Sequence, residues 1–401
     1  MKAKITLLAV LTFISVSTIN AQFNYRNDSI IEEALSRINV DSIEYQLQWL
    51  EDMGTRFLMA PNHKNVSGRI KARFESYGMT EVRLDSFQCY TNINYSILNY
   101  DTTTWQYNVE AKIIGTLYPD EELIVMGHHD NVQLDSDPEI YTPGADDNAS
   151  GTVAALETAR VLMQMNYQPE RTIIFLTTAA EELMYFGDAG SRHYAYEAAD
   201  SGKNIWGVIN NDMIAYDNGS NNITLSNVIG SEEITGVAEM ITETYTNLNP
   251  MVDYPNPSSG ADLQPFIEVG YHGVYLMESV FNPYYHTELD LVANVDLDYL
   301  TEAIKISCGT VLYTDITVGT NDNSTGSKII SVYPNPASKY IRLSGNIDNL
   351  NKIQLLTIGG NHVKEIEIKN EINISDLRSG IYILLLETNS GEFQFEKLIV
   401  Q

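Results

Sequence analysis

Histidine and carboxylate side chains follow several apolar, strand-like runs of this sequence. In chain order they are His128, Asp130, Asp146, Asp147, Glu181, Glu182, Asp212 and His286. The chain has only seven histidines, so this conjunction is more informative than any single acid among its 53. Clustered carboxylates repel one another unless a cation compensates them, and imidazole with carboxylate suits zinc, with cobalt or manganese as substitutes. The lack of thiolates predicts a catalytic site, and five ligands can hold two ions about 3.5–4 Å apart around a shared water.

Parallel strands of one sheet would bring these side chains together. The apolar runs are ELIVMG (122–127), TIIFLTT (172–178), IWGVIN (205–210) and GVYLME (273–278), and a helical pattern covers 150–165. Strands that are apolar on both faces must be covered on both, which predicts an α/β fold with a mostly parallel central sheet and helices on both faces. Amphipathic patterns within 42–56 and 63–79 predict two earlier helices. Functional groups should lie beyond the carboxyl ends of the strands.

The ordered motifs GHHD, GADDNASG, AAEEL, NNDMIA and YHT resemble those of the secreted di-zinc aminopeptidases, most closely the bacterial leucyl aminopeptidases, over about residues 30–315. The resemblance implies two zinc ions per chain, bridged by Asp146. It places His128 and Asp212 at one ion. It places Glu182 and His286 at the other.

The same resemblance assigns roles to neighbouring residues. Glu181 would be the general base, and Asp130 would orient the first histidine of the set. His129 should point away from the ligands by strand alternation and give packing or polar support. We take Asp147 as a supporting residue rather than a ligand, and the resemblance implies a cis peptide between Asp146 and Asp147.

One segment departs from the family pattern. The close relatives have a disulfide-closed loop with a tyrosine, then Ser-Asp-His, whereas this chain reads DYPNPSSGADLQPF without cysteine. Leu263 stands where the histidine would be, and Tyr254 and Asp262 are the local counterparts, which leaves the role of this loop open. Phe266, Met277, Phe281 and Tyr284 lie near the expected site and indicate an apolar pocket for the first substrate residue.

The N-terminus reads as a secretory signal peptide. Residues 1–21 contain two lysines, an apolar run from Ile5 to Val16 and a closing Ala21, after which we expect cleavage. The apolar run is too short to span a bilayer, so we expect an exported protein without a membrane anchor. With only Cys89 and Cys308 the chain is not a disulfide scaffold, although pairing of these two stays open.

The C-terminal region has a different sequence pattern, with short strand-like runs and no helical period. Residues 319–328 are small and polar and predict a linker, and residues 329–401 contain about seven short strand-like runs, which predicts a small antiparallel β-sandwich. The motif from Tyr333 to Ala337 and the later LTIGGNHV, ISDLRSGIYILLLET and EKLIV resemble the C-terminal sorting domain of the type IX secretion route. The resemblance implies that the secretion machinery is a partner and that the domain is removed. A generic accessory or carbohydrate-binding module is the alternative.

The charge balance excludes some partners. The net charge of −29 repels phosphate backbones and anionic lipid, so we expect no binding of nucleic acid or membrane surface through charge. An acidic site would instead attract the cationic amine of a peptide N-terminus. We therefore predict a secreted or cell-surface zinc metallo-aminopeptidase whose catalytic domain is 22–318. The alternatives are a glutaminyl cyclase-like enzyme with one zinc, and a non-catalytic binding domain on the same fold.

Overall fold

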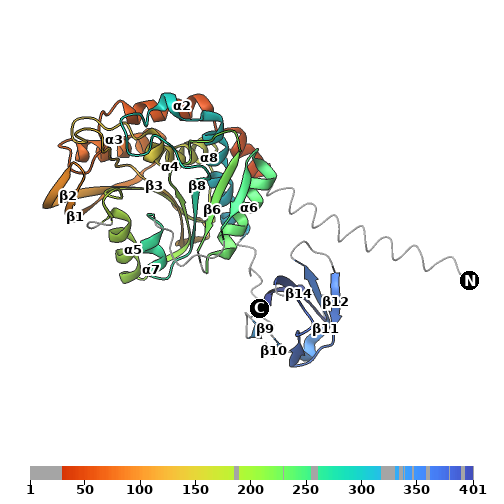
Figure 1. Cartoon of the computed structure of the whole chain (residues 1–401). Coiled ribbons are helices and arrows are strands. Elements are labelled where there is room, and N and C mark those ends of the chain that lie inside the picture. The colour runs from red at the N-terminus through yellow and green to blue at the C-terminus, as the bar shows by residue number, and fades with distance from the viewer. Residues whose placement is uncertain are drawn as a thin grey trace, which may run out of the picture. The chain divides into compact units, whose positions relative to one another are not determined.

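The computed structural model describes most of the chain in two units. The described residues are 29–184, 189–228, 230–253, 261–317, 330–333, 337, 339–345, 347–357, 362–378, 380–389 and 393–400. One unit extends to Gly319 and the other begins at Thr320 (Figure 1). The expected signal peptide, the expected linker and Tyr254 lie outside the described residues.

The larger unit contains one eight-stranded sheet and the helices that cover it. Its strands are β1 (Glu81–Tyr95), β2 (Leu98–Ile113), β3 (Tyr118–His128), β4 (Arg171–Thr178), β5 (Asn204–Asn211), β6 (Asn222–Asn227), β7 (Asn249–Val252) and β8 (Gly273–Glu278). Its helices are α2 (Val40–Glu51), α3 (His63–Ser76), α4 (Gly151–Gln164), α5 (Gly190–Asp200), α6 (Glu232–Tyr245), α7 (Gln264–Glu268) and α8 (Leu297–Thr317).

The sheet has a parallel centre and antiparallel flanks. The strand order is β1-β2-β4-β3-β5-β8-β6-β7, and the pairs β4–β3, β3–β5 and β5–β8 are parallel. The carboxyl ends of β3, β4, β5 and β8 therefore meet at one edge. The prediction of an α/β fold with a mostly parallel central sheet is confirmed, and α2 and α3 match the two early amphipathic patterns.

Each face of the sheet has its own hydrophobic core, because side chains alternate along the strands. On β3, Leu123 and Val125 pack into the core that includes residues of α2, α3, α4, α6 and α8. Ile124 and Met126 pack into the core formed with α5 and α7 on the opposite face (Figure 1). Helices therefore cover both faces, and β3 is held at the centre of the sheet.

Close backbone packing joins the end of β3 to the start of α4. A Cβ atom at Gly127 would lie 2.5 Å from the carbonyl carbon of Gly151, and one at Gly151 would collide with the carbonyl oxygen of Asn211 at the end of β5. Glycine is required at both positions because no side chain fits. The segments that follow β3 and β5 are thereby brought against the turn that precedes α4.

The β1–β2 ribbon was not predicted from the sequence. Its two long antiparallel strands pair from Glu81 with Lys112 to Tyr95 with Leu98, and β2 extends the central sheet beside β4. Cys89 lies on this ribbon, whereas Cys308 lies on α8 in a different hydrophobic cluster. The two cysteines form no disulfide.

The smaller unit is an antiparallel β module. Its strands are β9 (Ile330–Tyr333), β10 (Tyr340–Gly345), β11 (Leu350–Thr357), β12 (His362–Ile366), β13 (Glu371–Asn373), β14 (Gly380–Thr388) and β15 (Phe393–Val400). They form sheets of three and four strands that share one hydrophobic core, as predicted. In the part of the chain that the structure describes, no helix is long and apolar enough to cross a bilayer.

Candidate active site

The side chains selected from the sequence converge at the carboxyl ends of the parallel strands. His128 ends β3, Glu181 and Glu182 follow β4, Asp212 follows β5, and His286 lies on the loop after β8. They form two groups of possible metal ligands: one is His128, Asp147 and Asp212, and the other is Asp147, Glu182 and His286. The two groups share one residue, which is Asp147.

Asp147 lies between the two histidines. Its Oδ1 is 3.3 Å from His128 Nε2, and its Oδ2 is 3.2 Å from His286 Nε2. Asp212 Oδ1 is 3.4 Å from the same nitrogen of His128, and Glu182 Oε2 is 2.8 Å from His286 Nε2. One carboxylate thus offers an oxygen to each group, which is the arrangement that a ligand shared by two ions requires.

Asp146, which the sequence analysis took as the shared ligand, occupies a different position. Its Oδ1 accepts a hydrogen bond from the backbone N–H of Ala215 at 2.8 Å, and its Oδ2 accepts one from Asn282 Nδ2 at 2.8 Å. The Asp146 prediction does not fit this geometry, because each of its oxygens already accepts a hydrogen bond and Asp146 belongs to neither group of possible metal ligands. The cis peptide is also one residue later than expected, between Asp147 and Asn148.

Asp130 holds the two glutamates that follow β4. Its two carboxylate oxygens accept hydrogen bonds from the backbone N–H groups of Glu181, at 3.1 Å, and Glu182, at 3.2 Å. The ring nitrogen Nδ1 of His128 lies 3.1 Å from the Asp130 carbonyl oxygen and 3.6 Å from its carboxylate. Asp130 therefore contacts the histidine as expected and also fixes the segment that carries the glutamates. His129 turns away, toward Ser67 and Thr177, as expected.

The backbone is strained at three points of this edge. Ala180, directly before the glutamates, has φ of 64°, Met213, directly after Asp212, has 53°, and His286 itself has 56°. Residues with a side chain rarely adopt this left-handed region, and such positions concentrate where function requires a particular side-chain direction. The strain thus coincides with the residues that carry the candidate ligands.

Burial and close charges shift the ionisation of the cluster. Burial alone would lower the pKa of His286, but Glu182 and Asp147 raise it to about 11. Burial, followed by the charge of Asp147, raises the pKa of Glu182 to about 7. Burial also opposes protonation of His128, yet Glu181 and Asp212 hold its pKa well above the ordinary value. The carboxylates therefore need positive charge beside them.

The donor set fits zinc. The His128 side chain is only 1% exposed, and its Nε2 is buried without a hydrogen-bond partner. The nearest charged atoms to this nitrogen are carboxylate oxygens, among them Asp147 Oδ1 at 3.3 Å. A buried imidazole nitrogen without a partner is costly unless an ion binds it. Two imidazoles with carboxylates and no thiolate are ligands of catalytic zinc sites.

Two residues that the sequence analysis did not select hydrogen-bond the backbone of the turn before α4, which carries Asp146 and Asp147. Asp290 accepts hydrogen bonds from the backbone N–H groups of Asp146, at 2.9 Å, and Asp147, at 3.0 Å. Arg56, fully buried, donates to the carbonyl oxygens of Pro143, at 2.8 Å, and Gly144, at 2.7 Å. No local motif marks either residue, since Asp290 is more than 140 positions from the turn.

The loop that departs from the family pattern and the expected apolar pocket are only partly as predicted. Asp262 is buried and accepts a hydrogen bond from Thr178 Oγ1 at the end of β4, whereas Leu263 lies in the hydrophobic core. Phe266, expected near the pocket, also lies in that core, which corrects its assignment. Tyr285 was not selected, yet its ring stacks on that of His286 with centroids 3.6 Å apart, and Phe281 packs against Tyr285 at 4.8 Å.

Two family models and several curated proteins are similar to this chain in sequence. Residues 108–311 match Peptidase family M28, and residues 331–401 match the secretion system C-terminal sorting domain. A probable aminopeptidase of Saccharomyces cerevisiae is 23% identical over 74% of this chain and 79% of its own. Leucine aminopeptidase 1 of Trichophyton equinum is 30% identical over 51% of this chain and 57% of its own.

Solved structures share the fold. LapB from Legionella pneumophila has a TM-score of 0.59 and 21% identity, with 71% of this chain and 74% of that chain covered. A glutaminyl cyclase of Fimbriiglobus ruber has a TM-score of 0.54 and 15% identity, with 69% and 95% covered. These similarities show that the chain has a zinc exopeptidase-like fold.

The chain belongs to Peptidase family M28, and the prediction of a zinc-dependent aminopeptidase is confirmed at the level of the family. Its C-terminal module is a secretion sorting domain, as the motifs beginning at Tyr333 indicated.

Proposed function

We propose that this protein removes N-terminal residues from peptides, with two zinc ions per chain. His128 and Asp212 would hold one ion, Glu182 and His286 the other, and Asp147 both. The observation that carries this proposal is the sharing of Asp147 between the two ligand groups. Bound zinc would acidify a water and polarise the scissile carbonyl.

Glu181 is the proposed general base. Its Oε2 lies 3.7 Å from His128 Nε2, it belongs to neither ligand group, and its side chain is 13% exposed. It can therefore take a proton from the attacking water and return it to the leaving amine. Asp130 positions it through the backbone hydrogen bond described above.

The same edge suits a free N-terminus. The carboxylates attract the cationic α-amine, and the Tyr285 and Phe281 rings beside His286 favour an apolar first residue. A glutaminyl cyclase-like activity is the second candidate because the fold is shared with such an enzyme. The two differ in product: an aminopeptidase releases a free amino acid, whereas a cyclase releases a cyclised N-terminus and ammonia.

A panel of aminoacyl-anilides with and without an N-acetyl block tests the proposal. Free substrates, those with apolar residues foremost, should be cleaved and blocked ones should not. Chelation should abolish turnover, and added zinc should restore it. Cleavage of blocked substrates, or full turnover by metal-free protein, would contradict the proposal.

We propose further that the protein crosses the outer membrane by the type IX route and acts outside the cell or on its surface. The signal-like N-terminus and the sorting module support this. Truncation after about residue 325 should keep turnover of small substrates, because none of the proposed ligands lies beyond that point, and should abolish export from the native host. Normal export of the truncated protein would contradict the assignment.

A further inference from the structure

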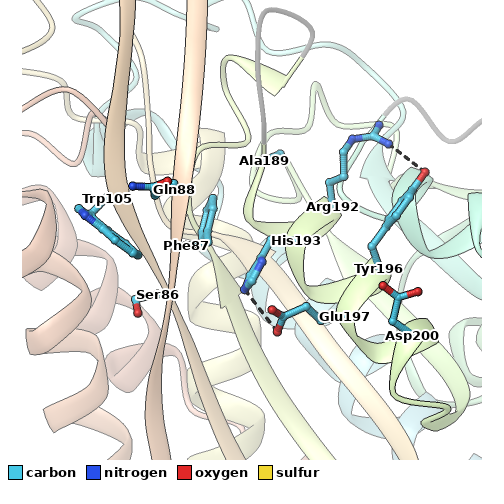
Figure 2. A pocket seen from close by; sticks show the side chains of 10 residues that line it. All are labelled: Ser86, Phe87, Gln88, Trp105, Ala189, Arg192, His193, Tyr196, Glu197 and Asp200. Carbon is cyan, nitrogen blue, oxygen red and sulfur yellow. Dashed lines mark hydrogen bonds and ion pairs between the residues drawn. The ribbon is translucent and has the colours of Figure 1, made fainter.

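A second cluster of metal-ligand type lies away from the proposed active site. It consists of Asp85 on β1 and of His193 and Glu197 on α5. The two helical residues are four positions apart, so they share one face of α5, and this face is turned toward β1. Figure 2 shows His193 and Glu197 side by side there, with Phe87 of β1 next to the imidazole.

The geometry around His193 repeats that around His128. His193 Nε2 lies 3.3 Å from Asp85 Oδ2 and 3.6 Å from Glu197 Oε2. His128 Nε2 lies 3.3 Å from Asp147 and 3.4 Å from Asp212. Both nitrogens are buried and make no hydrogen bond, although carboxylate oxygens surround them. Ligands bound tetrahedrally at about 2.0–2.1 Å lie about 3.3 Å apart, which is the spacing seen at both histidines.

We propose that Asp85, His193 and Glu197 bind a zinc ion that is distinct from those of the active site. One imidazole with two carboxylates is a zinc-type set, whereas calcium takes six to eight oxygens. His193 and Glu197 line a cavity of about 590 Å³, from which an ion or water can approach them. The acidic Asp200 lines the same cavity.

Neighbouring contacts prepare Asp85 and tie the cluster to the fold. Arg83 Nη1 binds Asp85 Oδ1 at 3.0 Å and leaves Oδ2 toward His193. Asn108 Nδ2 donates to Asp85 Oδ2 at 3.3 Å and to the carbonyl oxygen of Gly190 at 3.0 Å. The ring of Phe87 stacks on that of His193 at 4.9 Å and limits its rotation. The guanidinium of Arg83 reduces the attraction for a cation, so binding should be weaker than at the active site.

A bound ion at this place would fasten α5 to the edge strand β1. The start of α5 is already joined to the end of β4, because the N–H of Gly190 donates to the carbonyl oxygen of Ala179 at 2.8 Å. Ala179 precedes the glutamates by two positions. Zinc would therefore stabilise the unit that includes the segment after β4 without touching the reacting atoms.

Zinc titration of the purified zinc-loaded protein, after dialysis to low free zinc, tests the proposal. Calorimetry should detect one further zinc ion per chain for the wild type, with a larger Kd than that of the active-site ions. The Tm of the wild type should rise as zinc is added. Glu197→Gln and His193→Asn should lose this equivalent and the rise in Tm. Asp200→Asn is the matched control and should keep both, and calcium should not replace zinc.

Glu197→Gln keeps the test valid if His193→Asn folds poorly, since the Glu197 side chain is 68% exposed. Aminoacyl-anilide turnover at low free zinc should be the same in wild type and Glu197→Gln, which separates this proposal from that of the active site. Equal zinc uptake by wild type, Glu197→Gln and Asp200→Asn would overturn it and leave His193 as an ordinary ion-paired histidine.

Discussion

The clusters around His128 and His193 use the same kinds of side chain in different settings. At His128 the imidazole is 1% exposed and the carboxylates come from loops that follow separate strands. At His193 the imidazole is 20% exposed, and Glu197 projects from the same helix into solvent. Similar distances between nitrogen and oxygen atoms therefore occur in a closed site and in an open one.

Support of the carboxylates is the main difference between the two clusters. Backbone N–H groups of Glu181, Glu182, Asp146 and Asp147 donate to Asp130 and Asp290, so the segments that carry the ligands are held from behind. The His193 cluster has Asn108 and Arg83 behind Asp85, while no described hydrogen bond holds the Glu197 carboxylate. Preorganisation of this kind distinguishes a site built for catalysis from one that only binds an ion.

The largest expected loss of metal and of activity is that of Asp147→Asn, compared with Asp146→Asn. Asp147→Asn should lower the metal content at both ligand groups and reduce turnover to background, because this carboxylate faces both histidines. Asp146→Asn should keep more metal and lose about 10–100-fold in activity, as changes behind the ligands do. Elemental analysis and kcat of the two variants check this, and greater metal loss in Asp146→Asn would restore the original assignment.

A smaller loss of activity is expected for Asp290, which hydrogen-bonds the backbone of the turn that carries Asp147. Asp290→Asn retains one acceptor for two backbone N–H groups, so the turn that carries Asp147 should loosen and kcat should fall about 10–100-fold. Asp296→Asn is the matched control, because Asp296 accepts from the backbone of Tyr299 at the start of α8 and does not contact the turn. Equal kcat in the two variants would show that Asp290 does not position the ligand.

The smallest effect concerns the stability contributed by His193 when chelator keeps the protein free of metal. Burial lowers the pKa of His193, but the Asp85 carboxylate 3.3 Å away and the charge of Glu197 outweigh burial and the nearby Arg83, so the pKa is raised above its ordinary value. The resulting stabilisation is complete below the unfolded pKa of about 6.5 and is lost as pH rises through the folded pKa.

Urea unfolding of wild type and His193→Asn in chelator measures this contribution. The difference in unfolding free energy should be larger at about pH 5.5 than at about pH 9, by about 1 kcal/mol or less. A difference that grows toward high pH would contradict the raised pKa.

The sequence was sufficient to predict that the candidate ligands lie close together. Apolar strand runs followed by His128, Glu182 and Asp212 predict one common edge, because parallel strands align their carboxyl ends. It was not sufficient to choose between Asp146 and Asp147. That choice depends on the backbone of the turn and on Asp290, which is distant in the chain.

The His193 cluster was beyond sequence reasoning for a similar reason. Asp85 lies on a polar strand that was not predicted, and it meets His193 and Glu197 only through the pairing of β1 with β2 and the placement of α5. His193 and Glu197 alone, four positions apart on a helix, are indistinguishable from surface residues. Only the tertiary contacts supply the third ligand.

Glu181 and Glu182, two adjacent identical side chains, give the most direct test of the proposed mechanism. Glu181→Gln cannot accept a proton, so kcat should fall about 10²–10⁴-fold while zinc content stays that of the wild type. Glu182→Gln should instead lose zinc, because its carboxylate faces His286 at 2.8 Å. Zinc content and kcat measured together for both variants decide the matter. A Glu181→Gln protein with near-normal kcat, or one that has lost zinc, would contradict the assignment of Glu181 as general base.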